Sequence, residues 1–169
     1  MMHFVNRHAD LSEAKRMSLQ AGLISLLLVS SPVLANNQID AEITGDRSLV
    51  TIGSRAEITL GNEYCSMKVT GKKSTPGYKP LAFEITLQCG NQHQVLWDIN
   101  QVSEEEYAFD DPRFFIEWAG DRDGDGIIDL VMDMSPKYSC SKRVTYLSSL
   151  AGDAEIVGIA GKPEKACGC

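Results

Sequence analysis

Segment 81–89 carries the pattern that most constrains the fold of this chain, an alternation of apolar and polar side chains. Its apolar positions are Leu81, Phe83, Ile85, Leu87 and Cys89. Because successive side chains of a β-strand point to opposite faces, this alternation predicts a strand with one face in a hydrophobic core. Residues 64–70 and 93–99 alternate in the same way, with turn-forming residues between the segments. The three segments therefore predict an antiparallel meander, with Val95, Trp97 and Ile99 of the last one facing inward.

Other segments show the same two-residue period, and no long segment shows the period of a helix. The further predicted strands are residues 56–60, 113–119, 127–134, 143–150 and 155–160, with weaker candidates at 39–44 and 48–52. Residues 101–112 interrupt the pattern with clustered Glu and Asp, which predicts either a short helix or an acidic loop. We therefore expect an all-β fold, a small antiparallel sandwich or open barrel with room for one short helix.

The first 35 residues have the organisation of a secretory signal peptide. Lys15 and Arg16 form a basic region, and an apolar run follows over residues 19–29. A cleavage site with small residues ends at Ala35. This order of basic, apolar and small residues is typical of export signals that a peptidase removes. We expect cleavage after Ala35, which leaves residues 36–169 as an exported domain in the periplasm or the medium.

A single membrane anchor is the alternative for the N-terminal segment. A membrane-spanning helix needs about 20 mostly apolar residues. The apolar run here is shorter and contains Gln20 and Ser25, and Pro32 follows soon after it. We therefore expect no membrane insertion once the signal peptide has been removed.

The charge of the chain limits the partners it can bind. The full chain has a net charge of −7, and the loss of three basic and two acidic residues with segment 1–35 changes this to −8. Nucleic acids and anionic lipids attract clustered Lys and Arg, so an acidic domain is poorly suited to either. We therefore expect no nucleic-acid partner, whereas a divalent cation is a natural companion.

Five cysteines follow the expected cleavage site, and in an oxidising compartment such residues usually form disulfides. Cys65 and Cys89 lie on the core-facing sides of two predicted strands, so we expect them to pair. Cys140 is expected to pair with Cys167 or with Cys169. The two C-terminal cysteines lack the Cys-x-x-Cys spacing of redox motifs, which favours a disulfide that anchors the tail over redox exchange or a soft-metal site.

The segment between residues 120 and 130 carries the sharpest functional signal. The candidate ligands, which all offer hard oxygen donors, are the carboxylates of Asp121, Asp123, Asp125 and Asp129 and the backbone carbonyl of Ile127. Ca²⁺ takes about six to eight oxygen ligands in a flexible geometry, and this spacing wraps the chain around such an ion. Gly126 permits the sharp turn that the loop requires. We therefore predict a Ca²⁺ site over residues 121–129.

The loop matches only the first half of an EF-hand. Counted from Asp121, the twelfth position is Met132, where an EF-hand places a bidentate Glu. The flanking residues alternate like strands rather than with the period of helices. The loop is therefore expected in a β-hairpin.

The run Asp-x-Asp-x-Asp-Gly-x-x-Asp-Leu, which begins at Asp121, resembles the calcium loop of the FG-GAP and VCBS β-repeats of integrin-like and bacterial extracellular proteins. The longer stretch Trp-Ala-Gly-Asp-x-Asp-Gly-Asp-Gly-x-x-Asp-Leu, followed by a tyrosine and Leu-Ser-Ser, is similar to that of small, uncharacterised proteobacterial periplasmic proteins. The resemblance implies a strand, loop, strand and strand unit over residues 110–150 and makes Asp129 the bidentate ligand. It implies a fold element and a metal, but no activity.

The sequence shows no motif of the common enzyme classes. No Gly-x-Ser-x-Gly, His-Glu-x-x-His or phosphate-binding loop occurs, and His93, the only histidine after residue 35, has no nucleophile pattern beside it. We therefore expect a non-enzymatic, exported Ca²⁺-binding β-domain that binds another macromolecule. In the specific version of this hypothesis, the chain is an inhibitor or immunity-type protein that binds a protein partner in the cell envelope.

Two alternatives belong to other classes of protein. A Ca²⁺-dependent hydrolase would use acidic residues near the loop. The candidates for that role are Glu104, Glu105, Glu106, Asp110 and Asp111. A structural component of the cell envelope would instead assemble with copies of itself.

Overall fold

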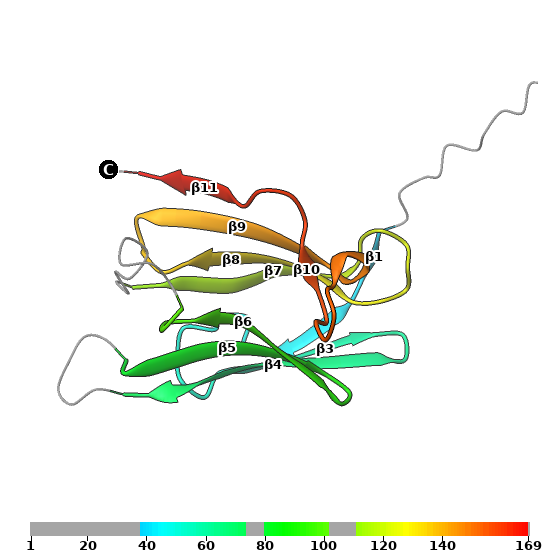
Figure 1. Ribbon diagram of the computed structural model, residues 1–169, viewed down its shortest axis with the longest axis horizontal. Coiled ribbons are helices and arrows are strands. Elements are labelled where there is room, and N and C mark those ends of the chain that lie inside the picture. Colours follow the sequence, from blue (N-terminus) through cyan, green and yellow to red (C-terminus); the bar gives the residue numbers. More distant parts are fainter. Residues whose placement is uncertain (1–37, 74–79, 102–110, 169) are drawn as a thin grey trace, which may run out of the picture. The chain divides into compact units, whose positions relative to one another are not determined.

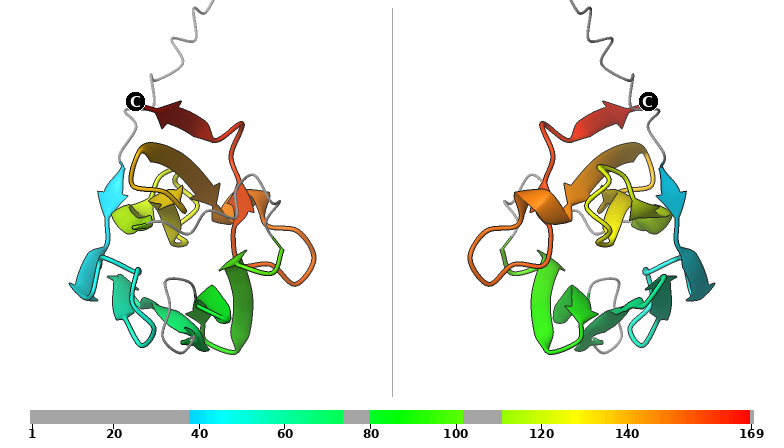
Figure 2. Two further views of the ribbon diagram at one scale, coloured as in Figure 1. Left: turned by 90° about the vertical axis from the view of Figure 1, so that its left-hand side faces the viewer. Right: turned by 90° about the vertical axis from the view of Figure 1, so that its right-hand side faces the viewer.

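The alternating segments form strands because their apolar side chains can be buried on one face while the polar ones stay in water. The structure, a computed structural model, describes residues 38–73, 80–101 and 111–168. Within these ranges the chain is all-β, and its strands form two antiparallel sheets that pack as a sandwich (Figures 1 and 2). The predicted fold class is confirmed, and of the two expected architectures the sandwich is the one present.

The first sheet is a meander in sequence order. Its strands are β2 (Glu42–Gly45), β3 (Arg55–Leu60), β4 (Glu63–Lys72), β5 (Ala82–Cys89) and β6 (Gln92–Asp98). The predicted three-stranded meander is the part from β4 to β6. Its inward side chains, such as Met67, Ile85 and Leu87, are fully buried.

The second sheet is centred on the β7–β8 hairpin. Its strands are β1 (Ile39–Asp40), β7 (Arg113–Asp121), β8 (Asp129–Ser135), β9 (Cys140–Leu147), β10 (Gly158–Ile159) and β11 (Glu164–Cys167). The order is β1-β7-β8-β9-β10, and β11 also pairs with β9. β10 pairs with the end of β9 and β11 with its beginning. A 3-10 turn, η1 (Ser148–Leu150), follows β9.

The core lies between the two sheets, and an aromatic cluster connects them. Phe83 of β5, Trp97 of β6 and Phe114 of β7 have ring centroids 4.8 to 5.8 Å apart. Aromatic pairs at such distances are favourable beyond the area they bury. Because Phe114 belongs to the second sheet, the cluster fixes the packing of one sheet on the other.

The first described residues connect the two sheets. β1 pairs with β7 in the second sheet, whereas β2 pairs with β3 in the first. Between these strands, the backbone N–H of Ala41 donates to the carbonyl oxygen of Ala119 at 2.9 Å. This segment therefore runs along one side of the sandwich, as the end-on views of Figure 2 show.

Three of the predicted strands need correction. Residues 48–52 form no strand: Ser48 makes an isolated bridge, and Leu49 inserts its side chain into the core. The strand predicted at 143–150 begins three residues earlier, at Cys140, and gives way to η1 after Leu147. The strand predicted at 155–160 is limited to β10, because side-chain hydrogen bonds from β6 take up the backbone groups just before it.

A bulge in β6 overturns the expectation for Val95. The pairing shifts between Ile85 and Thr86, so that Leu96 is an extra residue between the paired Val95 and Trp97. Trp97 faces the core as expected, but the alternation reverses beyond the bulge and Val95 is 40% exposed. The exposure of Leu81, also expected to face inward, has a simpler cause, since this residue precedes the first residue of β5.

Among the described residues, two disulfides join neighbouring strands, one in each sheet. The bridge between Cys65 and Cys89 connects β4 and β5, as expected. Cys140 is bridged to Cys167 of β11, which decides between its two expected partners. Both bridges join residues directly opposite in the strand register. Two disulfides fit a protein of an oxidising compartment.

Some expectations concern residues outside the described ranges. They are the signal peptide at 1–35, the acidic segment at 102–110 and any pairing of Cys169. Among the residues that the structure describes, no helix has the length and apolar character that a membrane span requires.

Candidate metal centre

The acidic loop lies at the tip of the β7–β8 hairpin, as the sequence predicts. Asp121 is the last residue of β7 and Asp129 is the first of β8. Gly120 pairs with Asp129, so the two strands bring the ends of the loop together. β1 flanks the same end of the hairpin, because Ile39 pairs with Asp121.

Gly120 allows β1 to pack closely against the hairpin. A Cβ at this position would lie 2.0 Å from the carbonyl oxygen of Ile39 and 2.5 Å from Cζ2 of Trp118. Trp118 in turn donates its Nε1–H to Oδ1 of Asp40 at 2.6 Å. The Trp-Ala-Gly-Asp stretch before the loop therefore holds β1 beside the acidic residues.

Three carboxylates converge at this hairpin tip. Asp121, Asp123 and Asp129 each offer an oxygen, and these oxygens all lie within 4.8 Å of one another. Asp121 and Asp129 are buried, at 4% and 0% exposure, whereas Asp123 is exposed. Two oxygens on opposite sides of a Ca²⁺ ion are about 5 Å apart, because Ca–O distances are roughly 2.3–2.6 Å. The group could therefore hold a metal ion.

The loop backbone orients two of these carboxylates. The two oxygens of Asp121 accept hydrogen bonds from the N–H groups of Gly124 at 2.6 Å and Gly126 at 2.9 Å. Oδ2 of Asp129 accepts from the N–H of Arg122 at 2.8 Å. Gly126 has a φ of 81°, a conformation that favours glycine, so it makes the turn expected of it.

The fold shifts the pKa of the Asp129 carboxyl. Burial raises the pKa of this carboxyl above its usual value, because the charged form loses its hydration. Hydrogen bonds from the backbone of Ser148 and Arg122 lower the pKa, and the nearby charge of Asp123 raises it. A bound cation would favour the carboxylate and so oppose the effect of burial.

Asp125 and Ile127, the other two candidate ligands, lie in the loop but outside the group of three. Oδ1 of Asp125 accepts from the N–H of Ile127 at 2.8 Å, and Oδ2 accepts from the hydroxyl of Ser148 at 2.6 Å. The side chain of Ile127 is 45% exposed. The structure thus brings together three of the four predicted carboxylates and directs the fourth toward Ser148.

Two serines of η1 complete the centre, and the motif analysis gave them no role. The N–H of Ser148 donates to Oδ1 of Asp129 at 2.8 Å, and the hydroxyl of Ser149 donates to Oδ2 of Asp123. These serines follow β9, which pairs with β8, so the sheet brings them to a loop far away in the sequence. The signal in the sequence that could have identified them is the Leu-Ser-Ser stretch, which is part of the resemblance described above.

The donor set fits a hard cation. All three converging groups are carboxylates, and neither His nor Cys belongs to the group. Zinc sites typically use nitrogen and sulfur ligands, whereas carboxylate oxygens suit Ca²⁺, Mg²⁺ and Mn²⁺. An oxygen that accepts one N–H keeps another lone pair, so the loop hydrogen bonds leave the carboxylates able to bind metal.

Of the residues named for a hydrolase, Asp111 is the one that the structure describes, and it does not belong to the group of three carboxylates. Glu104, Glu105, Glu106 and Asp110 lie outside the described residues, and Asp111 is exposed. A shallow depression of about 380 Å³ does adjoin the loop, between it and the β3–β4 turn. Its lining includes Ile39, Leu60 and Asp121.

No family model matches the chain, and no curated protein or solved structure matches it either.

Proposed function

We propose that this protein is an exported Ca²⁺-binding β-domain that acts by binding another macromolecule rather than by catalysis. The observation that supports this proposal is the convergence of Asp121, Asp123 and Asp129 at the tip of one hairpin. An inhibitor or immunity-type protein that meets a protein partner in the cell envelope is the version we favour. Such a protein needs a small rigid domain with a presented surface, and no catalytic group.

Ca²⁺ is the proposed ion because of the number and flexibility of the available oxygens. Ca²⁺ accepts about six to eight oxygens in a variable geometry, whereas Mg²⁺ demands a nearly octahedral shell. We propose that Asp125 and the carbonyl of Ile127 add to the three converging carboxylates, and that Asp129 binds through both oxygens. Extracellular calcium modules bind at about 10⁻⁴ to 10⁻³ M, and we expect an affinity in that range.

The ion is proposed to act as a structural tie. It neutralises the repulsion between carboxylates that include the buried Asp129. It also holds the hairpin tip against η1, whose serines donate to Asp129 and Asp123. An ion that binds only the folded protein stabilises that state by mass action.

Three exposed apolar side chains around the loop form the proposed contact surface. Ile39, Ile127 and Leu150 are 54%, 45% and 52% exposed. Ile39 pairs with Asp121, Ile127 lies in the loop, and Leu150 follows the metal-site serines in η1. Exposed apolar groups that gather at one place often mark an interaction site. The ion would therefore fix the relative positions of the residues that meet the partner.

Export is proposed from two independent observations. The first 35 residues have the basic, apolar and small-residue organisation of a signal peptide. The described part of the chain contains two disulfides, which form and persist in oxidising compartments. The periplasm and the external medium are such compartments, and both contain Ca²⁺.

Calorimetric titration of the purified protein with Ca²⁺, paired with thermal melts in Ca²⁺ and in chelator, tests the metal. We expect saturable binding, and about 2.7 kcal/mol of added stability when free Ca²⁺ is 100 times its dissociation constant. Asp123→Ala should abolish both effects, and because this side chain is exposed the variant should still fold. Asp153→Ala removes an exposed carboxylate outside the acidic loop and should bind normally. Binding that survives Asp123→Ala would contradict the site.

Co-purification from a periplasmic extract tests the partner. We expect a protein that is retained in Ca²⁺, released by chelator, and lost in the double variant Ile127→Ser, Leu150→Ser. The same protein should be retained by a control variant in which the exposed Val95 of β6 is replaced by Ser. If the partner is retained in chelator and by the double variant alike, the result would argue against a contact surface that depends on Ca²⁺.

A further inference from the structure

The disulfide between Cys140 and Cys167 differs from the other bridge in its surroundings. Cys65 is buried in the core at 1% exposure, and Cys89 is half-buried. Cys167 lies on β11, whose four residues are all exposed and whose ladder partner is β9. Cys140, opposite it, is half-buried. Solvent and solutes therefore reach the second bridge more readily than the first.

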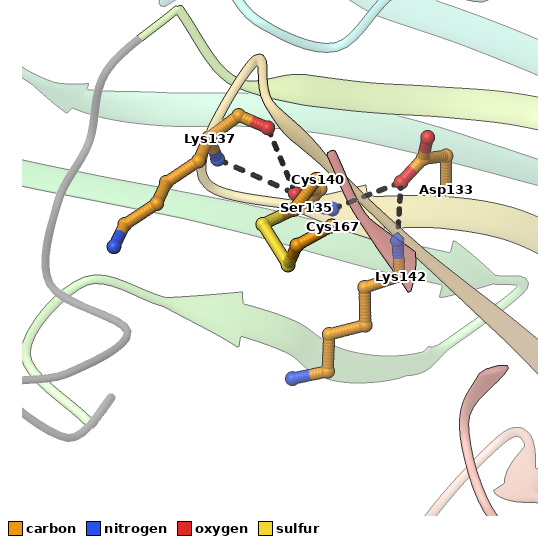
Figure 3. The surroundings of a disulfide bond; sticks show 6 residues. All are labelled: Asp133, Ser135, Lys137, Cys140, Lys142 and Cys167. Carbon is orange, nitrogen blue, oxygen red and sulfur yellow. Dashed lines mark hydrogen bonds between the residues drawn. A yellow bond between two sulfur atoms is a disulfide. The ribbon is translucent and has the colours of Figure 1, made fainter. Parts of the chain in front are cut away.

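Three lysines line a pocket beside this exposed bridge. This pocket of about 110 Å³ is lined by Lys137, Lys142 and Lys165 together with both cysteines. In the β9–β11 ladder, Lys142 lies directly opposite Lys165, two residues from the opposed cysteines. Because residues two apart share a face of a strand, the lysine pair and the disulfide lie on the same face. Figure 3 shows Lys137 and Lys142 in the surroundings of the sulfur atoms.

The three lysines bring positive charge to one face of the β9–β11 ladder, at the pocket that both cysteines line. The chain as a whole is acidic, with a net charge of −7, so three lysines at one small pocket go against its composition. Ammonium groups near a cysteine lower the pKa of its thiol and stabilise the thiolate. The cluster therefore suits a sulfur atom that becomes an anion.

The backbone around Cys140 is held by a buried aspartate. Oδ1 of Asp133 accepts the N–H groups of Ser135 at 3.1 Å and of Lys142 at 3.0 Å (Figure 3). The hydroxyl of Ser135 donates to the carbonyl oxygen of Lys137 at 3.0 Å. These bonds fix the turn between β8 and β9, which carries Lys137 and ends at Cys140. The Cys140 side of the bridge therefore keeps its place if the bridge opens.

We propose that the Cys140–Cys167 bridge is a site of thiol–disulfide exchange with a cysteine thiolate of another protein. The incoming thiolate attacks Sγ of the exposed Cys167 and forms a mixed disulfide with it. The bond between the two original sulfurs breaks, and its electron pair leaves with Sγ of Cys140 as a thiolate in the lysine-lined pocket. One disulfide replaces another, so the step needs no further oxidant or reductant. It does not depend on the proposed metal.

Native-state reaction with glutathione tests this proposal. The purified Cys169→Ser protein is incubated with glutathione, free thiols are trapped with iodoacetamide, and each cysteine is followed by peptide mass spectrometry. We expect Cys140 and Cys167 to open at least about tenfold faster than Cys65 and Cys89, with glutathione attached to Cys167. Equal rates for the two bridges, or glutathione attached to Cys140 instead, would overturn the proposal.

Charge variants test the role of the lysines. Exchange is slower when the leaving thiol has a higher pKa. Replacing Lys137, Lys142 and Lys165 together by Gln should therefore slow opening at least about threefold, whereas Arg at the same positions should restore the rate. A control with Lys68, Lys72 and Lys73 replaced by Gln removes equal charge from exposed positions of β4 and the residue after it. The proposal fails if the pocket variant reacts like the unmodified protein or the control is slowed equally. The protection of Cys65 and Cys89 reports in each variant that the fold is intact.

Discussion

At the scale of single residues, the phenol of Tyr146 shows how the core controls ionisation. Its side chain is 5% exposed, and burial raises its pKa from 10 to about 12. An unfolded chain would ionise this group near pH 10, whereas the folded protein keeps it neutral. The stability that follows from this difference is fully present below pH 10 and is lost as the pH rises toward 12.

We predict that Tyr146→Phe makes the protein less sensitive to alkali. At pH 11 the loss of stability caused by Tyr146 is about 1.4 kcal/mol, and Phe, which cannot ionise, removes that loss while it keeps a ring in the core. Urea unfolding of both proteins at pH 8 and pH 11 measures the effect. An identical pH dependence in the two proteins would show that the pKa of Tyr146 is not raised.

Two buried aspartates of β8 show what residue spacing can and cannot predict. Asp129 was predicted as a metal ligand and lies in the carboxylate group. Asp133, on the same strand, instead accepts two backbone N–H groups and lies 3.7 Å from Arg113. Spacing identifies a chain that can wrap an ion. It does not show which carboxylates the neighbouring backbone already occupies, nor that Ser148 will reach the loop from another strand.

At the scale of elements, the bulge in β6 gives Gln94 a structural role. Its Oε1 accepts the N–H groups of Ile156 and Val157 at 2.8 and 2.9 Å. Its Nε2 donates to the carbonyl oxygen of Val157 at 2.9 Å. The side chain therefore replaces a strand as the partner of this backbone, and it ties β6 of the first sheet to the segment before β10 of the second.

Gln94→Leu should destabilise the protein because it leaves three backbone groups without their partner. A buried group that loses its hydrogen bond costs about 1–3 kcal/mol, and partial access to water reduces the sum, so we expect a loss of about 2–4 kcal/mol in urea unfolding. Gln92→Leu, at an exposed position of the same strand, is the matched control and should change stability by less than about 0.5 kcal/mol. Similar losses in both variants would show that the three hydrogen bonds contribute little.

The elements that could be predicted from the sequence are those with one buried face. β3, β4 and β5 alternate because the core takes every second apolar side chain, and their buried apolar residues follow that period. β11 was missed because its four residues are all exposed, so burial leaves no period in its sequence. β10 has two residues, too few for a pattern. The bulge in β6 was missed because an extra residue changes the alternation without any distinctive residue type.

At the scale of the whole molecule, the two disulfides close loops of similar size but constrain different parts. Their sequence separations are 24 and 27 residues, for which loop entropy alone gives about 3.5 kcal/mol each. The bridge in the first sheet joins two strands of the core. The other holds β11, an exposed strand that would otherwise gain freedom in the folded state as well. This bridge therefore lowers the entropy of the folded state as well as that of the unfolded state, so it stabilises the fold less.

We predict that replacing Cys65 and Cys89 by Ala costs at least about 3 kcal/mol of stability. Replacing Cys140 and Cys167 by Ala should cost less than half as much, because β11 can detach locally while the core stays folded. Urea unfolding measures the global losses, and hydrogen exchange should show new opening confined to residues 164–168 in the second variant. A larger loss from the second pair would mean that β11 belongs to the cooperative core.

The N-terminal segment that belongs to both sheets sets the order in which the molecule can assemble. β2 to β6 are neighbours along the chain, and closing the short loops between them loses little entropy. β1 has to find β7 much farther along the chain, a non-local pairing of the kind that slows folding. β1, which precedes the other described strands in the sequence, is thus fixed late, beside Asp121. A metal ion bound at this hairpin would consequently indicate that folding is complete, because β1 has by then paired with β7.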